Sequence, residues 1–247
     1  AARQCWCANI CAGIKHGLGS SSGHTLLTID IILAGWYHYH VIVLLQCGAL
    51  HGKAVCIMKM VKDKKLVVGA DFAGYPLKEA VVAHLKAKGW EIEDVGVKSP
   101  DDNDTENMFH RVGLRIGAKI AEGEYERALA FCGTGMGIHI AASKCPHVHA
   151  GVVESVPAAL RAITGNGVNV LAMGAFYVAP QMGCDIADAY LNASLGSGYE
   201  WWHNFYEFHK LAIDELEAFN YDEYRKAGFK VKHLGDYPLS LETKPEE

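Results

Sequence analysis

Residues 127–144 read Arg127-Ala-Leu-Ala-Phe-Cys132-Gly-Thr-Gly-Met-Gly137-Ile-His-Ile-Ala-Ala-Ser-Lys144. The apolar residues up to Cys132 predict a buried strand, the glycines that follow predict a sharp turn, and Met136–Lys144 predicts a helix. In an open α/β sheet, ligands bind outside the carboxyl ends of the strands. Cys132 ends its strand, so the sequence predicts chemistry at this cysteine.

The glycine turn adds a second feature to that position. Glycine adopts positive φ readily, so Gly133, Gly135 and Gly137 allow the backbone to approach a ligand closely. Their N–H groups and the following helix N-terminus form a cradle for negative charge, and a thiol in such a field ionises more easily. A base beside an oxyanion cradle is what an enzyme needs to remove a proton next to a carbonyl. The structural alternative is that Cys132 is simply a small buried hydrophobe, the usual state of a free cysteine.

The spacing of the glycines fails two nucleotide-binding motifs. A dinucleotide fingerprint needs G-x-G-x-x-G, and Ile138 stands where the last glycine would be. A mononucleotide phosphate loop needs Gly-Lys-Ser/Thr, and Gly137 is followed by Ile138 and His139. The turn is therefore not a nucleotide site of either kind.

The rest of the chain after Met60 alternates between strand and helix patterns. The predicted strands are Lys65–Ala70, Trp90–Val95, Arg127–Cys132, His147–Val153 and Val168–Gly174. The predicted helices are Pro76–Lys88, Met108–Glu122, Met136–Lys144, Pro157–Thr164, Pro180–Leu195 and, after an aromatic cluster, Leu211–Tyr224. Five strands that alternate with helices predict an α/β fold with a parallel sheet covered on both faces.

Composition sets broad limits on what the protein does. The chain has 247 residues, of which 50% are hydrophobic, enough for a globular core. A net charge of −5 with scattered basic residues provides no electrostatic footprint for nucleic acid, so no nucleic-acid partner is expected. Only three of the eight cysteines, Cys132, Cys145 and Cys184, lie beyond residue 57. This suits a reducing compartment, and we expect a cytoplasmic protein.

The first 57 residues lack the strand–helix pattern. Leu26–Leu45 is apolar but is interrupted by one aspartate and two histidines, so we expect no membrane span. Cys5-x-Cys7 could suggest zinc, but the segment contains no C-x-x-C pair, so we expect no metal site there. We expect the fold to begin near Met58 or Met60 and residues 1–57 to be an extension outside it.

Three segments, in order, carry a family resemblance. They are Gly69-Ala-Asp71-Phe-Ala-Gly74-Tyr-Pro-Leu-Lys78, then Cys132-Gly-Thr-Gly-Met-Gly137 with Ile140-Ala-Ala-Ser-Lys144, then Asn166-Gly-Val-Asn169-Val-Leu-Ala-Met-Gly174. Together they resemble the family of type B ribose-5-phosphate isomerase and galactose-6-phosphate isomerase. The resemblance implies a three-layer α/β/α Rossmann-like fold with a five-stranded parallel sheet. It also implies aldose–ketose isomerisation through a cis-enediolate without metal or cofactor, and a homodimer whose C-terminal helix helps to build the partner's site.

The resemblance assigns roles to individual residues. Cys132 would be the general base, Asp71 would lie near the sugar hydroxyls, Thr134 would bond a substrate oxygen and Asn166 would touch the enediolate oxygen. The expected substrate-binding residues are Phe72, Gly133, Gly135, Met136, Gly137 and Asn166. Two structural alternatives stay open, because Asp71 is also a good helix cap and Thr134 can simply satisfy the turn. Some relatives use a glutamate on the following helix as base, but here that position is Ile138, which leaves Cys132.

The sequence also departs from the family pattern. Phe72 and Gly165 stand where the family usually has histidines, the second of which is thought to open the sugar ring. The region of the family's phosphate-binding arginines, around His203–His209, has no arginine. Either the substrate is short and open-chain, such as a tetrose phosphate, or it is an unphosphorylated sugar stacked on Phe72 and the Trp201-Trp202 pair. Candidate replacements for the lost anchors are His110, Arg111, Arg161, His203 and His209.

We therefore expect three parts. Residues 1–57 form an extension, 58–198 the sugar-phosphate isomerase-like α/β domain, and 199–247 an aromatic-rich helical tail that packs in a dimer. The expected function is isomerisation of a small sugar or sugar phosphate. An epimerase acting through the same enediolate, and a non-catalytic sugar- or nucleotide-binding module on a degenerate isomerase fold, remain as alternatives.

Overall fold

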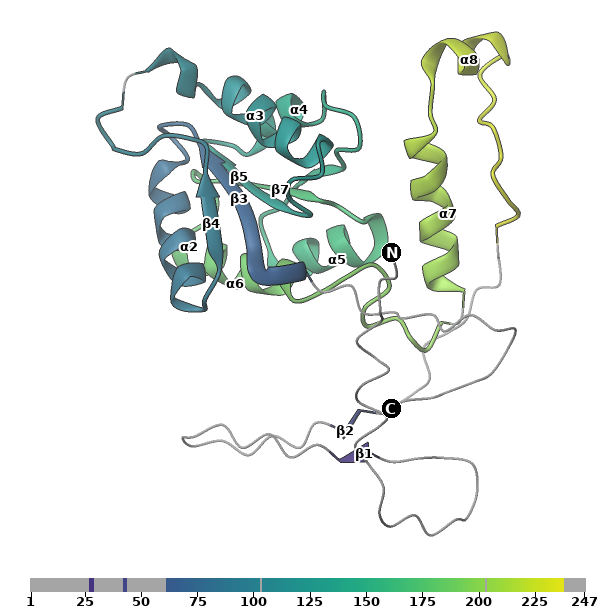
Figure 1. Cartoon of the computed structure of the whole chain (residues 1–247), viewed down its shortest axis with the longest axis horizontal. Helices are drawn as coiled ribbons and strands as arrows, with labels where there is room; N and C mark the ends of the chain where they lie inside the picture. The colour runs from purple at the N-terminus through teal and green to yellow at the C-terminus, as the bar shows by residue number, and fades with distance from the viewer. Residues whose placement is uncertain (1–26, 29–41, 44–60, 103, 203, 238–247) are drawn as a thin grey trace, which may run out of the picture. The chain divides into compact units, whose positions relative to one another are not determined.

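The computed structural model describes residues 27–28, 42–43, 61–102, 104–202 and 204–237 (Figure 1). The chain divides into two compact units, Ala1–Val55 and Cys56–Glu247. The described part of the first unit is an antiparallel pair of two-residue strands, β1 (Leu27–Thr28) and β2 (Ile42–Val43). The other residues of the predicted 1–57 extension lie outside the described part of the chain.

The second unit is built on a five-stranded parallel sheet. Its strands are β3 (Lys65–Ala70), β4 (Glu91–Asp94), β5 (Ala128–Cys132), β6 (Ala150–Val152) and β7 (Val170–Gly174). They lie in the order β4-β3-β5-β7-β6, and every neighbouring pair is parallel. The predicted fold class is confirmed.

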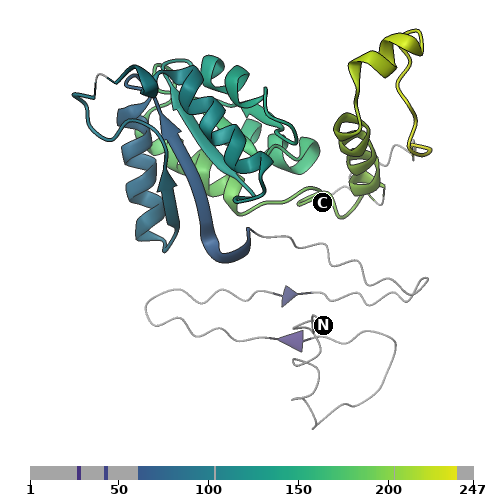
Figure 2. The ribbon, with the colours of Figure 1, turned by 45° about the horizontal axis from the view of Figure 1, so that its top comes forward.

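Helices cover both faces of this sheet. The helices α2 (Tyr75–Ala87), α5 (Val156–Asn166) and α6 (Pro180–Leu191) share one apolar core with the sheet. The helices α3 (Phe109–Ala121) and α4 (Met136–Ala142) pack together over the other face, as Figure 2 shows. Two short 3₁₀ turns, η1 (Lys62–Lys64) and η2 (Thr105–Asn107), precede β3 and α3. In the ranges that the structure describes, no helix has the length and apolarity needed to cross a bilayer.

The core explains why the strands read as apolar runs. Leu66 and Val68 join the core on the α2 face, while Val67 between them joins the core on the α3 face. Every residue of β5 and β7 is buried. A strand with helices on both faces has no side chain left for water, so strict alternation of apolar and polar residues disappears.

The C-terminal helix was predicted wrongly. The single helix expected over Leu211–Tyr224 is two helices, α7 (Phe205–Glu217) and α8 (Tyr221–Lys226). Asn220 separates them, because its side-chain oxygen accepts a hydrogen bond from Glu223 N at 3.1 Å and so caps the start of α8. The first helix starts at Phe205, inside the segment that reads as an aromatic cluster.

Two different strands form the edges of the sheet. The edge strand β4 has four residues, of which Glu91, Glu93 and Asp94 are acidic. The opposite edge strand, β6, has only three residues. The long apolar strands β5 and β7 lie inside the sheet.

Candidate active site

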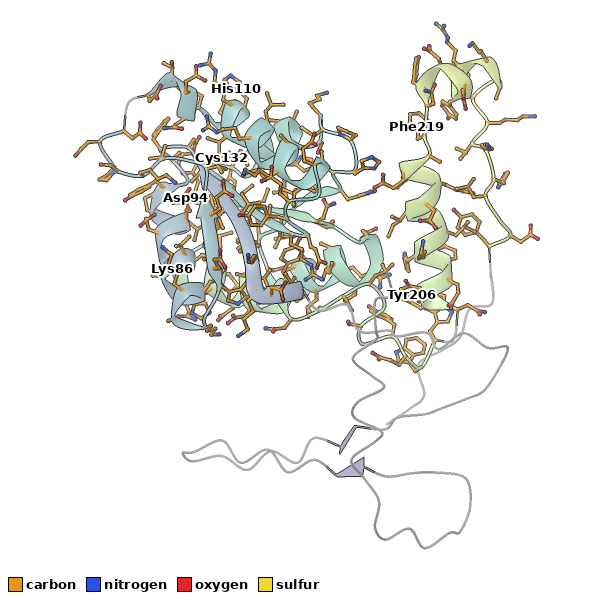
Figure 3. All side chains as sticks on the ribbon, viewed as in Figure 1. Lys86, Asp94, His110, Cys132, Tyr206 and Phe219 are labelled. Atoms are coloured by element: carbon orange, nitrogen blue, oxygen red, sulfur yellow. The ribbon has the colours of Figure 1, made fainter. Side chains whose placement is uncertain are left out.

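Cys132 and Asp71 lie side by side at the carboxyl edge of the sheet. Cys132 is the last residue of β5, and Asp71 directly follows β3. These two strands are adjacent and parallel, and Ala70 of β3 pairs with Phe131 of β5. The backbone N–H of Asp71 donates to Phe131 O at 3.3 Å, which joins the two strand ends. Figure 3 labels Cys132 and Asp94 at this end of the sheet and Lys86 toward the other end. The structure thus brings together two of the three predicted catalytic residues, and the third, Thr134, follows in the turn.

The turn after β5 holds the cysteine sulfur. Sγ of Cys132 accepts a hydrogen bond from the backbone N–H of Gly135 at 3.0 Å, and only 4% of the residue is exposed. Gly135 has φ of 76°, in the left-handed region that favours glycine. Oγ1 of Thr134 accepts from Met136 N at 3.2 Å, which is the turn-satisfying contact named as the structural alternative. These two bonds orient Cys132 and Thr134 in the absence of substrate.

Two aromatic rings lie over the outer glycines of the turn. A Cβ added at Gly133 would be 2.6 Å from the ring of Phe176, and one added at Gly137 would be 2.6 Å from the ring of Phe109. Phe176 is 69% exposed and its N–H donates to Gly133 O at 2.9 Å. Sequence reasoning missed Phe176, although it follows the end of β7 just as Asp71 follows β3. Met136 is exposed at the same turn.

Asp71 is buried and engaged with its own loop. Burial raises the pKa of its carboxyl group, while hydrogen bonds from the backbone N–H groups of Gly74 and Ala73 act in the opposite direction. Its Oδ1 accepts from Gly74 N at 2.8 Å. This bond closes the loop between β3 and α2, but Asp71 does not cap the helix, because the N-cap of α2 is Gly74, without a side-chain cap bond.

A hollow of about 270 Å³ opens beside these residues. It is lined by Phe72, Val97, Pro100, Asp102, Asp104, Asn107 and Met108. Phe72 is 64% exposed there. The backbone N–H of Asp104 and the amide of Asn107 donate to Asp102 and lower the pKa of its carboxyl group, although partial burial opposes this. A hollow lined by the acidic side chains of Asp102 and Asp104 suits hydroxyl groups and repels a phosphate.

Lys78 fixes the wall of this hollow. Its side chain is fully buried on α2, and Nζ contacts Asp94 Oδ2 at 2.5 Å and the carbonyl oxygen of Val97 at 2.5 Å. Glu79 Oε1 lies 3.0 Å away. A buried ammonium group needs such partners because its desolvation is costly. Lys78 thereby ties α2 to the end of β4 and to Val97, which lines the hollow.

Asn166 lies at the other end of the sheet, where the strands begin. It is the last residue of α5 and precedes β7, whereas Gly174, at the other end of β7, pairs with Cys132. Four strand steps correspond to about 13 Å, so one chain does not bring Asn166 to its own Cys132. Asn169 has a structural role, since its side chain bonds His149 N at 2.9 Å and His147 O at 2.8 Å.

The candidate replacements for the lost anchors are scattered. His110 is exposed with its ring against Phe109, and Arg111 pairs with Glu106. Arg161 and His209 both lie against the ring of Phe205, and burial and then the charge of Arg161 lower the pKa of His209. His203 lies outside the described residues. The described candidates lie on three different helices, with His110 and Arg111 on α3, Arg161 on α5 and His209 on α7.

Comparison with known proteins places the chain in a family. A family model described as ribose/galactose isomerase matches residues 66–201. A 4-deoxy-4-sulfo-D-erythrose isomerase of Clostridium sp. (strain MSTE9) is 36% identical over 162 residues, which cover 66% of this chain and 99% of the relative. A D-erythrulose-4-phosphate isomerase 2 of Mycolicibacterium smegmatis is 36% identical over 138 residues, or 55% of this chain and 86% of the relative.

The solved structures agree with this result. Ribose-5-phosphate isomerase B of Clostridium thermocellum superposes with a TM-score of 0.54 and 29% identity, over 66% of this chain and 99% of its own. The protein is thus an enzyme of the aldose–ketose isomerase class. The chain belongs to the ribose/galactose isomerase family.

Proposed function

We propose that this enzyme interconverts the aldose and ketose forms of a short, open-chain sugar that carries a terminal anion, with Cys132 as the general base. The observation that carries the proposal is the position of the Cys132 sulfur, held by Gly135 N at the sheet edge and adjacent to Asp71. The size of the substrate is supported by two relatives at 36% identity that are named for four-carbon sugars, one of them matched over 99% of its length, while a ribose-5-phosphate isomerase B at the same identity is matched over 88%.

The proposed reaction needs one proton carrier and one oxyanion site. The thiolate of Cys132 takes the proton from C2 of the aldose, and the electron pair moves to form a C1–C2 double bond with negative charge on O1. The proton then returns from Sγ to C1, while the O2 proton moves to O1 and C2 becomes the ketone carbon. Thr134 and Asp71 hold the hydroxyl groups. Atoms and charge balance without a cofactor.

Backbone N–H groups of the turn would stabilise the enediolate. The N–H group of Gly135 already donates to Cys132 Sγ, and that of Met136 donates to Thr134 Oγ1. We therefore assign the enediolate oxygen to the remaining N–H groups of the turn, those of Gly133, Thr134 and Gly137. The proposed oxyanion site is therefore smaller than the cradle that the glycine pattern predicts for the whole turn.

The departures from the family pattern fit a four-carbon substrate. A tetrose closes a ring only through O4, so a phosphate on O4 or a sulfonate on C4 keeps the chain open. Such a substrate needs no histidine to open a ring, which agrees with Gly165 and Phe72 at the two family histidine positions. The small volume of the hollow next to Phe72 also suits a short chain.

A homodimer is part of the proposal. Asn166 lies at the sheet edge opposite Cys132, so its predicted contact with the enediolate requires a second copy. Large apolar side chains stand exposed around the Cys132 turn and make a surface suited to such a copy: Met136, Ile140, Phe176 and Tyr177. The aromatic tail after residue 198 would add to this contact.

Replacement of the base is the direct test. Cys132→Ala should lower kcat by at least about a hundredfold, as expected when a general base is removed. Cys184→Ala is the matched control, because Cys184 is also a free, buried cysteine but lies on α6. Circular dichroism and thermal midpoints establish that both variants fold. Near-normal turnover by folded Cys132→Ala would contradict the mechanism.

The substrate is tested by comparing kcat/KM under one condition. D-erythrulose 4-phosphate and 4-deoxy-4-sulfo-D-erythrose should be turned over better than ribose 5-phosphate or galactose 6-phosphate, because the six- and five-carbon sugars must first open their rings. Unphosphorylated erythrulose tests whether the anion matters at all. If ribose 5-phosphate were the best substrate by tenfold or more, our interpretation of Phe72 and Gly165 would be wrong.

A further inference from the structure

The guanidinium group of Arg161 occupies the space of the missing family histidine. A Cβ added at Gly165 would lie 3.1 Å from both Cζ and Nε of Arg161. A larger side chain at position 165 would therefore displace this guanidinium group. Glycine at position 165 and arginine at position 161 together put a permanent positive charge where relatives have an imidazole.

Two aromatic rings hold Arg161 in this place. Cζ lies 4.9 Å from the ring centre of Tyr199 and 5.1 Å from that of Phe205, within cation–π distance of both. The two rings stack on each other with centres 4.0 Å apart. Gly196 N donates to Thr164 O at 2.8 Å, which fastens the segment before these rings to the end of α5. The side chain of Arg161 is thus oriented before any ligand binds.

The charge of Arg161 is available to a ligand. Among the described residues, the arginine ion pairs belong to Arg111 and Arg225, and Arg161 has none. Arg161 is exposed, and Asn166 beside it is an exposed amide whose Nδ2 donates to Arg161 O at 3.4 Å. Burial and then the charge of Arg161 lower the pKa of neighbouring His209, which disfavours a second positive charge beside Arg161. A planar guanidinium beside an amide donor matches a tetrahedral oxyanion.

The geometry points to Arg161 as the residue that recognises the terminal phosphate or sulfonate of the substrate in the site of a second copy. Arg161 and Asn166 lie together at the end of the sheet opposite Cys132, so they can reach the Cys132 of a second copy but not their own. The assignment therefore rests on the dimer of the proposed function. The acidic hollow next to Phe72 repels such an anion, so a cation from elsewhere is needed to bind it. Arg161 belongs to none of the three segments that carry the family resemblance, and the sequence alone gives it only as one of five candidate replacements for the lost anchors.

Kinetics of Arg161→Gln test this role. KM for D-erythrulose 4-phosphate and for 4-deoxy-4-sulfo-D-erythrose should rise at least tenfold with kcat nearly unchanged, whereas KM for unphosphorylated erythrulose should stay the same. KM of Arg161→Lys for the charged sugars should lie between those of wild type and Arg161→Gln, because lysine keeps the charge but not the planar fork. Arg225→Gln, on the exposed helix α8, is the matched control. Equal losses with charged and neutral sugars would indicate a structural role and overturn the assignment.

A mixing experiment separates this inference from the proposed function. Cys132→Ala and Arg161→Gln chains, exchanged into one dimer, create one site with Cys132 from one chain and Arg161 from the other. Low-KM activity should therefore return on mixing; no return would place Arg161 in its own chain's site and overturn the assignment. Calorimetric titration with inorganic phosphate gives a readout that does not require turnover. Wild-type binding that disappears in Arg161→Gln supports the anion site, and equal or absent binding in both contradicts it, whatever Cys132→Ala shows about the base.

Discussion

At the scale of single residues, the site depends on how closely the backbone packs around Cys132. A Cβ added at Gly74 would lie 2.4 Å from the carbonyl carbon of Phe131 and 2.6 Å from Cys132 N. Those atoms belong to the central strand β5 and have no free space to move into. At Gly133, in contrast, the obstacle is the outer end of the exposed Phe176 ring, which can rotate away.

This contrast predicts different results for two similar substitutions. Gly74→Ala should lower the free energy of unfolding by about 1–3 kcal/mol, the usual range for overpacking, and should reduce activity by displacing Cys132. Gly133→Ala should leave stability nearly unchanged, because only a surface ring must shift. Chemical denaturation of both variants measures the difference. Equal stability of the two variants would show that the strand ends yield more easily than their packing indicates.

The same scale shows what the sequence could predict about the site. The rule that ligands bind where parallel strands end predicts chemistry at Cys132, whereas the roles of Thr134 and Asp71 come from the family resemblance. That rule also applies to Phe176, two residues past β7, which was overlooked because a phenylalanine has no acid–base chemistry. Strand polarity places Asn166 at the other edge, yet only the family resemblance assigned it to the substrate. Contacts such as Arg161 over Tyr199 depend on chain segments nearly forty residues apart and are not visible in local patterns.

At the scale of elements, α7 is attached to the α/β unit by a carboxylate between two histidines. Glu217, at the end of α7, accepts hydrogen bonds from His147 Nδ1 and His149 Nε2, each at 2.5 Å. Partial burial raises the pKa of Glu217, but the bonds from His149 and then His147 outweigh it, so the pKa lies below its ordinary value of 4.5. A lowered pKa means that the ionised form stabilises the folded state.

The attachment of α7 should therefore depend on pH in one direction. The stabilisation is fully present above the ordinary carboxylate pKa and is lost as pH falls through the lowered value. Hydrogen-exchange protection of Phe205–Glu217, corrected for intrinsic rates, should be roughly threefold to tenfold lower in Glu217→Gln than in wild type at pH 6, as for a hydrogen bond worth about 1 kcal/mol. The two should converge as pH falls through the lowered pKa of Glu217.

Asp214→Asn is the control for this measurement. It removes the same charge from the same helix, but the ion pair of Asp214 within the described residues is with Lys210, four residues away on α7 itself. Its protection should match wild type at both pH values. A loss of protection as large as that of Glu217→Gln would show that net charge, not the two histidines, holds α7.

The elements also show where sequence patterns are reliable. The predicted β3, Lys65–Ala70, has the observed bounds, because a buried strand in a parallel sheet is a short apolar run between polar residues. The tail was harder. Aromatic residues at 205–208 obscured the start of α7, and the cap at Asn220 broke what looked like one helix. Few tertiary contacts constrain the exposed α8, so short-range capping decides its bounds.

At the scale of the whole molecule, the α/β unit contains its own core. The apolar clusters on the two faces of the sheet consist of residues from Val61 onward. Deletion of residues 1–57 should therefore leave solubility and the thermal midpoint nearly unchanged. Deletion of residues 1–70 is the control that must fail, because it removes β3, an interior strand between β4 and β5. Unfolding of the shorter deletion, measured by circular dichroism, would place the extension in the fold.

The edges of the sheet have a consequence for self-association. An exposed strand edge can recruit a strand from another molecule and so start amyloid-like growth. Here the acidic β4 would bring like charges together in such a pairing, and the three-residue β6 provides too few backbone groups to sustain one. The strongly apolar strands that would aggregate are enclosed on both sides. Copies of this chain should thus meet through the side chains of helices and loops and not by extending the sheet, which leaves the carboxyl edge with Cys132 free to face a partner.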